Sequence, residues 1–243
     1  MMEQITSRDN PKVRQVIKLQ TNRRAREKEG LFCCEGEKLL REALSSGIQV
    51  EQVFLSEDLP QAEALELGPK TYRVPRRLME QMSGVESPQG VLFVCRRPQL
   101  AASIPQGCCL VLEDVRDPGN VGTVVRTAEA LGVPVLLTGS CADLYQPKTI
   151  RATMGSIFRA DVRQVERDAL WAQWAEQGTA AYAAALTPQA KDIRQVDLRQ
   201  AAVVVGNEAQ GVSPAMQQHC GGQVIIPIQG AESLNASVAA ALV

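Results

Sequence analysis

Hydrophobic residues in this chain are grouped in short runs that alternate with segments of helical spacing. In the second half, CCLVLEDV is a continuous apolar run, which is typical of a strand covered on both faces. The runs VPVLLTG, AAVVVGN and GQVIIPI predict further strands, and ALWAQWAEQG and SLNASVAAALV lie among the segments that predict helices. Such alternation predicts an α/β fold with a parallel sheet and helices on its faces.

The first part of the chain carries a second, smaller α/β pattern. Asn10 followed by Pro11 predicts the start of a helix, because these residue types favour the cap and the first helical position. The stretches VEQVFLS, TYRV and GVLFV predict strands. LFCCEGEKLLREAL predicts a strand followed by a helix, in which three leucines are expected to point inward: Leu39, Leu40 and Leu44.

The boundary between the two patterns falls in RRPQLAASIPQG, which contains Pro and Gly and has no clear periodicity. A length of 243 residues is compatible with two domains. We therefore predict an N-terminal domain over 1–97, a linker over 98–107 and a C-terminal domain over 108–243.

Charge is balanced over the whole chain but not along it. The chain has 26 basic and 27 acidic residues, which argues against a protein that coats nucleic acid through its overall charge. Residues 1–28, however, contain eight Lys or Arg and three acidic residues, a net charge of +5. This segment is either a solvated amphipathic helix or a surface that follows a phosphate backbone.

Several classes of protein are disfavoured by the sequence. The seven cysteines include no CxxC spacing, so neither a disulfide framework nor a zinc or other metal site is expected. We expect no membrane partner, because no run approaches the roughly 20 apolar residues of a membrane helix. With no apolar signal region at the N-terminus, a reducing cytoplasm is the expected location. His219 is the only histidine, and we expect it to be structural because no nucleophile motif accompanies it.

Three polar turns that contain glycine lie at the predicted carboxyl ends of strands, where parallel sheets bind ligands. The first, over 114–126, lacks both GxxxxGK[ST] and GxGxxG and instead has Asn120, Gly122 and Arg126. We expect Asn120 to cap the helix and Gly122 to leave room for an anionic group beside Arg126. Alternatively, Arg126 is an ordinary surface arginine.

The second turn, over 206–212, reads GNEAQGV, and the third, over 228–237, ends in a cluster of Ser233, Asn235 and Ser237. Glu208 either favours the start of a helix or orders a site. A single residue would suffice to cap the last helix, so the cluster of three polar side chains indicates a further role.

Together, these three turns resemble the three motifs of the SpoU/TrmH methyltransferases, which belong to the trefoil-knotted SPOUT superfamily. The matching residues are Asn120-x-Gly122-xxx-Arg126-x-Ala128, Gly206-Asn207-Glu208-xx-Gly211 and Ile226-Pro227-Ile228 with Ser233-Leu234-Asn235-x-Ser237. The N-terminal stretches SRDNPKVRQVIKL, EGEKLLREAL and SPQGVLFV resemble the ribosomal-protein-like RNA-binding domain of the members that act on ribosomal RNA.

The resemblance implies methylation of a ribose 2′-hydroxyl in RNA by S-adenosylmethionine, a knotted C-terminal domain and a homodimer. It implies a cofactor pocket lined by Gly206, Ile226 and Leu234, with Thr138 and Gly139 as further candidates. It also implies five residues at the catalytic site. Arg126 and Asn120 are expected to face the RNA, Ser233 and Asn235 to lie between cofactor and RNA, and Glu208 to order the site.

This sequence departs from the family pattern at two places. Asn207 stands where Ser or Ala is usual, and the chain stops at Val243, where family members usually continue the helix and add basic residues. The second departure leads us to expect that the sequence is truncated there, which bears on the packing of a dimer.

Ribosomal RNA, with the large subunit favoured, is the substrate that the N-terminal block implies. Two alternatives stay open: a transfer RNA 2′-O-methyltransferase, and a noncatalytic RNA-binding or assembly protein on the same fold. An unrelated nucleotide-binding enzyme is disfavoured because both phosphate-binding fingerprints are missing.

Overall fold

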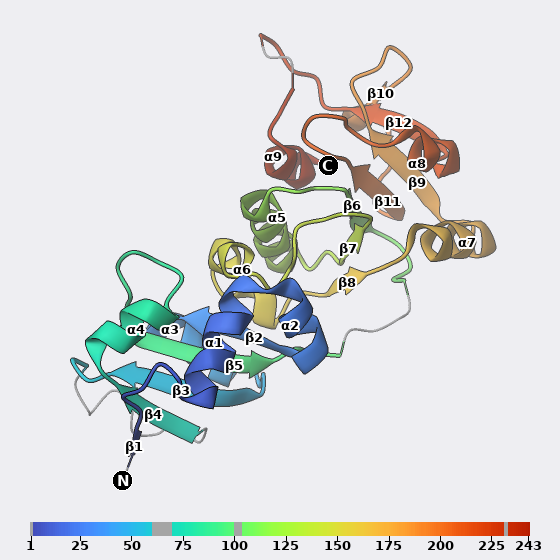
Figure 1. The fold of residues 1–243 in the computed structure, drawn as a ribbon. Coiled ribbons are helices and arrows are strands. Elements are labelled where there is room, and N and C mark those ends of the chain that lie inside the picture. The colour runs from blue at the N-terminus through green and yellow to red at the C-terminus, as the bar shows by residue number, and fades with distance from the viewer. Residues whose placement is uncertain (1, 60–69, 100–103, 231–232) are drawn as a thin grey trace. The chain divides into compact units, whose positions relative to one another are not determined.

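The structure, a computed structural model, describes residues 2–59, 70–99, 104–230 and 233–243 (Figure 1). Of the predicted linker, residues 100–103 lie outside the described residues, as do residues 231–232 of the third turn. The chain forms two compact units. Met1–Gln99 and Tyr145–Phe158 make up the first, and Leu100–Leu144 and Arg159–Val243 make up the second.

The first unit is built on a five-stranded mixed sheet in the order β1-β4-β3-β5-β2. β5 pairs antiparallel with β2 and β3, and the remaining pairs are parallel. Its strands are β1 (Glu3–Gln4), β2 (Leu31–Glu35), β3 (Val50–Ser56), β4 (Lys70–Val74) and β5 (Val91–Arg96). Its helices are α1 (Pro11–Thr21), α2 (Arg23–Glu29), α3 (Glu37–Ser45), α4 (Arg76–Met82) and α6 (Pro147–Thr153), with a short 3-10 helix η2 (Ser156–Phe158).

Local signals predict the start of α1 correctly but not the whole buried face of α3. The side chain of Asn10 accepts a hydrogen bond of 2.9 Å from the backbone N–H of Lys12, which confirms the predicted cap of α1. In α3, Leu40 is buried as expected, but the prediction that Leu44 points inward is wrong because its side chain is 37% exposed. Ala43 takes the inward position instead, three residues after Leu40 on the same helical face.

Residues 145–158 belong to the first unit although they come from the second half of the chain. The ring of Tyr145 lies 4.8 Å from the ring of Phe32 in β2, and the ring of Phe158 lies 6.4 Å from it. The Arg97 guanidinium lies over the ring of Tyr145, with its Cζ 4.4 Å from the ring centre. These aromatic contacts attach the segment to the sheet of the first unit.

The second unit contains a seven-stranded sheet in the order β10-β12-β9-β11-β6-β7-β8, in which every pair is parallel. This confirms the predicted α/β class with a parallel sheet. The strands are β6 (Cys109–Glu113), β7 (Val135–Thr138), β8 (Val162–Gln164), β9 (Ala180–Ala184), β10 (Lys191–Asp192), β11 (Ala201–Val205) and β12 (Gly222–Ile225). The helices are α5 (Pro118–Leu131), α7 (Arg167–Gln177), α8 (Pro214–His219) and α9 (Ala236–Leu242), with a 3-10 helix η3 (Ile193–Gln195).

Continuous apolar runs form the centre of this sheet. Every residue of β6, β7 and β11 is buried, as expected for strands with helices on both faces. β10 was not predicted, because two polar residues carry no apolar run or alternation. Within the described residues, no helix has the length and apolar character needed to cross a bilayer.

The start of α5 differs from the prediction. Asp117 caps this helix, with its Oδ1 accepting a hydrogen bond of 2.9 Å from the backbone N–H of Asn120. Pro118 takes the first helical position, where its missing N–H leaves no backbone group unpaired. Asn120 is therefore the third residue of the helix and not its cap, which leaves its amide group available for contacts with other loops.

Candidate active site

A pocket of about 560 Å³ opens at the carboxyl ends of β9, β11 and β12 in the second unit. The second and third polar turns both contribute to it, which agrees with the general position of ligands in parallel sheets. Its lining includes the end of each strand and the residues that follow it: 184–187 for β9, 205–212 for β11, and 224–226, 228 and 233–236 for β12. The volume lies within the range of about 300–1,000 Å³ that is usual for sites of small ligands.

The turn after β11 folds back sharply on itself. Asn207 and Gly211 exchange two backbone hydrogen bonds, with N···O distances of 3.0 and 2.8 Å. The side-chain oxygen of Asn207 also accepts hydrogen bonds from the N–H groups of Ala209 and Gln210. A Cβ atom added to Gly206 would collide with the backbone of Gly211 and Val212. Only glycine allows the chain to approach itself this closely.

A hydrogen-bonded network joins all three polar turns. Asn120 Nδ2 donates to Glu208 Oε1 at 2.9 Å, and Asn235 Nδ2 donates to Asn120 Oδ1 at 3.0 Å. The partners are 88 and 115 residues apart in sequence. The predicted residues Asn120, Glu208 and Asn235 are therefore brought together by the fold, and both ends of the Asn120 amide are occupied.

Glu208 attaches the second turn to the beginning of α5. Its carboxylate accepts hydrogen bonds from the backbone N–H groups of Arg116, at 3.3 Å, and Asp117, at 3.2 Å. Partial burial raises the pKa of Glu208, but hydrogen bonds from Asn120, from its own N–H and from these two N–H groups outweigh burial and leave the pKa lowered. Glu208 is therefore ionised at neutral pH and organises the loop.

The third turn uses Asn235 as the cap of α9. Its Oδ1 accepts hydrogen bonds from Ser237 Oγ at 2.6 Å, Ser237 N–H at 2.9 Å and Val238 N–H at 3.4 Å. Ser233, in contrast, is exposed and lines the pocket together with Leu234 and Ile226. Within the cluster of three polar residues, Asn235 and Ser237 thus shape the helix end, and Ser233 is left facing the pocket.

Arg126 lies on α5, and the pocket lining does not include it. Its side chain is exposed, and among the described residues no acidic side chain forms an ion pair with it. Gly122, one turn earlier on α5, is buried, and its role beside Arg126 stays a prediction. The guanidinium is nevertheless accessible to a ligand from solvent.

Two further candidates lie apart from the pocket. Thr138 ends β7 and is only 2% exposed, and Gly139 follows it with φ of +68°. Neither lines the pocket, because β7 is separated from β11 by β6. The structure thus gathers Gly206, Ile226, Leu234 and Ser233 around the pocket, links Asn120, Glu208 and Asn235 beside them, and leaves Thr138, Gly139 and Arg126 outside its lining.

Sequence reasoning missed part of the pocket wall. Thr187 and Gln217 line it, and Gln223 joins them: Thr187 Oγ1 donates to Gln223 Oε1, and Gln223 Nε2 donates to Gln217 Oε1 at 2.8 Å. Thr187 follows a weak alanine-rich strand, so its position after a strand end was the one available signal. His219, off this wall, stacks on Trp171 with ring centres 4.1 Å apart.

The charge of the pocket indicates what kind of ligand fits. Its described lining residues include one carboxylate, Glu208, and no lysine or arginine. A polyphosphate would find no cation among the described lining residues, and near the start of α5 the N–H groups of Asp117 and Asn120 are already directed at Glu208 and Asp117. A neutral or cationic nucleoside, bound mainly by apolar contacts and backbone groups, fits this lining better.

Comparison with known proteins finds two family models that together match most of the chain. Residues 107–243 match the SpoU rRNA Methylase family, and residues 10–92 match the MRM3-like substrate binding domain. The chain is 32% identical over 243 residues to the 23S rRNA (guanosine(2553)-2′-O)-methyltransferase RlmP of Bacillus subtilis, covering 99% of this chain and 97% of that protein.

Two further similar proteins are also rRNA methyltransferases by name, one a sequence relative and one a solved structure. The chain is 30% identical over 213 residues to the 23S rRNA (uridine(2479)-2′-O)-methyltransferase of Streptomyces viridochromogenes, covering 84% of this chain and 68% of that protein. The solved structure of an AdoMet-bound rRNA methyltransferase from Sinorhizobium meliloti has a TM-score of 0.85 and 27% identity, covering 99% of this chain and 95% of that chain.

Proposed function

Because the chain belongs to the SpoU rRNA Methylase family, we propose that it methylates a ribose 2′-hydroxyl of large-subunit ribosomal RNA with S-adenosylmethionine. The match confirms the resemblance seen in the three sequence motifs. The observation that carries the proposal is the pocket lined by the second and third motifs, joined to the first motif through Asn120. Cytoplasmic location is part of the same proposal.

The pocket residues fit S-adenosylmethionine by their chemistry. When bound, this cofactor supplies a methyl group that its sulfonium charge already activates. Gly206, Ile226 and Leu234 would hold it, with the backbone of the 206–212 turn accessible because Gly206 permits the tight fold. The single carboxylate and the lack of described lysine or arginine in the lining suit a ligand with a positive centre.

The remaining motif residues divide into positioning and substrate-facing groups. Glu208 and Asn120 use their polar atoms on each other and on the protein, so we assign them to positioning the loops. Ser233 faces the pocket and Asn235 stands beside it, between cofactor and RNA. Arg126 would bind a substrate phosphate and stabilise negative charge on the 2′-oxygen, since a guanidinium with a pKa above about 12 is a poor base.

RNA binding is proposed for the first unit, where α1 carries the basic segment. Arg14 and Lys18 are four residues apart, exposed on one face, and border the same surface hollow as Lys12. Lys18 is paired with Glu29 at 3.8 Å, a longer distance than the 3.2 Å between Lys12 and Glu3, and its side chain is more exposed than that of Lys12. Arg26 is buried against backbone oxygens at the end of α1 and is not offered to a phosphate.

We expect the double variant Arg14→Gln/Lys18→Gln to bind 23S rRNA more weakly than the wild type. Each cation that contacts a phosphate contributes about one unit to the slope of log affinity against log salt. Filter binding over a range of KCl concentrations should show a slope shallower by about one to two units. Lys38→Gln/Arg41→Gln removes two cations from α3 as a matched control; an equal effect in both variants would contradict a specific role for α1.

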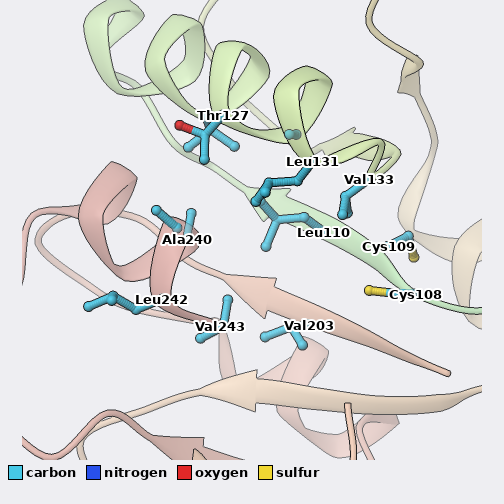
Figure 2. Close-up of a pocket in the computed structure, with 13 residues that line it drawn as sticks. Cys108, Cys109, Leu110, Thr127, Leu131, Val133, Val203, Ala240, Leu242 and Val243 are labelled. Carbon is cyan, nitrogen blue, oxygen red and sulfur yellow. The ribbon is translucent and has the colours of Figure 1, made fainter. Parts of the chain in front are cut away.

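A homodimer is proposed on the basis of an apolar surface at the ends of α5 and α9. Leu131 and Leu242 are 67% and 55% exposed there. Both line a pocket of about 220 Å³, together with Leu110 of β6, Val203 of β11 and Val243. Figure 2 shows these side chains around the pocket. Exposed apolar patches of this kind mark contact surfaces, and two copies related by a twofold axis would cover them.

Leu131→Asp/Leu242→Asp should shift the protein from dimer to monomer, because two charges would be desolvated in each half of the interface. Analytical ultracentrifugation at micromolar concentration measures the change. Leu44→Asp, a substitution of a half-exposed leucine on α3, should leave the mass unchanged. A dimer that persists in the double variant would place the interface elsewhere.

The order of the second sheet supports the knot that the family resemblance implies. β12 lies beyond β9 and β11 from β6, yet α9, which follows β12, packs against α5 and β11. The described residues after β12, namely 226–230 and 233–243, therefore bring the chain back from β12 to α5 and β11.

Two measurements test the proposed function against its alternatives. Isothermal titration should show S-adenosylmethionine binding to the purified protein, and a noncatalytic RNA-binding protein would show none. Mapping of 2′-O-methyl groups in a strain that lacks the protein should reveal one missing mark in 23S rRNA. Loss of a mark in transfer RNA instead would favour the transfer RNA enzyme and contradict the ribosomal substrate.

A further inference from the structure

Both ends of the loop after β11, residues 206–213, are attached to two acidic residues at the end of β6. Glu113 is 1% exposed and accepts hydrogen bonds from Ser213 N–H at 2.8 Å and Ser213 Oγ at 2.7 Å. The backbone oxygen of Asp114 accepts a hydrogen bond of 2.9 Å from Asn207 Nδ2. The position of this pocket wall therefore depends on how Glu113 and Asp114 are held.

Arg167, the first residue of α7, contacts both acidic residues. Its Nη2 forms an ion pair with Asp114 Oδ2. Its Nε lies 3.2 Å from Glu113 Oε1, within ion-pair distance, although the N–H is not aligned for a hydrogen bond. Because Glu113 is buried, its charge needs a nearby cation, and Arg167 supplies it.

Asp114 has a backbone conformation that few residues other than glycine adopt. Its φ is +55°, in the left-handed region. Both carboxylate oxygens are held, Oδ2 by Arg167 and Oδ1 by the N–H of Ser140 at 2.6 Å. A Cβ at Gly139 would lie 2.5 Å from Arg167 Nη2 and from Asp114 Oδ1, so this glycine leaves room for the ion pair. The fixed side chain of Asp114 thereby directs its carbonyl oxygen toward Asn207.

We propose that Arg167, Asp114 and Asn207 form a clamp that holds the 206–213 loop in the shape that binds S-adenosylmethionine. Arg167 is thus a positioning residue for methyl transfer, at a place in the sequence that none of the three motifs covers. The inference rests on the proposed function for the identity of the ligand, and on the hydrogen bonds and ion pairs above for the mechanism.

The first test separates the backbone of Asp114 from its carboxylate. Asp114→Ala removes the side chain that maintains positive φ, and we expect it to raise the Kd for S-adenosylmethionine about tenfold in isothermal titration. Asp114→Gly removes the same carboxylate, and with it the ion pair with Arg167, but adopts positive φ without steric cost, so its Kd should also rise about tenfold. A Kd for Asp114→Gly within about threefold of wild type would overturn the clamp, because positive φ at residue 114 would then suffice without the carboxylate.

The second test asks whether Arg167 and Asn207 act on the same loop. Arg167→Gln and Asn207→Ala should each raise KM for S-adenosylmethionine about tenfold and leave kcat within about threefold of wild type. If both residues act on one loop, the KM of the double variant should not exceed the higher KM of the two single variants. Additive effects, or equal losses in kcat and affinity, would overturn the proposal. Asn207→Ala removes no charge. Its KM therefore still tests the proposal if Arg167→Gln lowers stability so much that the variant does not fold.

Arg199→Ala provides the matched control, because it breaks an arginine–aspartate pair on the surface of the same unit, with Asp197. Its KM should equal that of wild type, and thermal unfolding of every variant shows whether a rise in KM merely follows lower stability. The wild-type titration is measured first. Absence of binding there would refute the proposed function, whereas normal wild-type binding with unaffected variants would refute the clamp alone.

Discussion

Replacing Arg126 with alanine is expected to lower kcat for methylation of 23S rRNA at least about 100-fold, while the Kd for S-adenosylmethionine stays within about threefold of wild type. Removing one group that stabilises developing charge in a transition state typically costs about 100- to 1,000-fold in rate. Cofactor affinity should be preserved because Arg126 does not line the pocket and forms no ion pair with a described residue. Single-turnover methyl transfer and isothermal titration measure the two quantities separately.

Two further variants define what Arg126 contributes. Arg126→Lys keeps the charge but loses the planar pair of donors, so an intermediate rate is expected. Arg194→Ala removes an exposed arginine that is paired with Asp192 on the same unit, and it should leave both rate and affinity unchanged. Parallel loss of rate and cofactor affinity in Arg126→Ala would show that this arginine supports the pocket rather than the RNA.

The second large effect is expected from Gly206→Ala, which should weaken S-adenosylmethionine binding by at least about 30-fold. An added methyl group would overlap the backbone of Gly211 and Val212, and a backbone cannot move aside as the end of a flexible side chain can. The two hydrogen bonds between Asn207 and Gly211 would then break, and the pocket wall would open. Isothermal titration measures the change directly.

Gly221→Ala is the matched control for this prediction. A Cβ at Gly221 would meet its nearest neighbour, the backbone oxygen of Ala181, at 3.8 Å, which is an ordinary contact. That variant should bind the cofactor like wild type. Cofactor binding that survives in Gly206→Ala would show that the loop has another conformation compatible with the ligand, and would contradict the role assigned to its tight turn.

The sequence was sufficient for features that depend on neighbouring residues. Continuous apolar runs predicted β6, β7 and β11, because strands covered on both faces need apolar residues at every position. The Asn10–Pro11 pair predicted the start of α1 for a similar local reason. Three motifs in order indicated the family, which the match over residues 107–243 confirms. The domain limits and the roles of the site residues stay predictions.

Local signals were ambiguous where two residues compete for the same role. Asn120 and Asp117 are both good caps, and Pro118 decides between them because it fits the first position of a helix. Leu44 and Ala43 are adjacent in α3, and the leucine is the one predicted to point inward, but the direction of the helix face buries Ala43. In such cases the packing of the whole unit outweighs propensity.

By itself, therefore, the sequence determined the α/β class, most of the elements and the family, since each follows from residues close together in the chain. Only the tertiary structure decided that the amide of Asn120 would be held between Glu208 and Asn235, 88 and 115 residues away. It alone placed Arg167 against Glu113 and Asp114, and attached residues 145–158 to the first unit. Which distant segments form hydrogen bonds and ion pairs depends on which strand ends meet at one edge of a sheet. A pattern of neighbouring residues does not indicate which strand ends these will be.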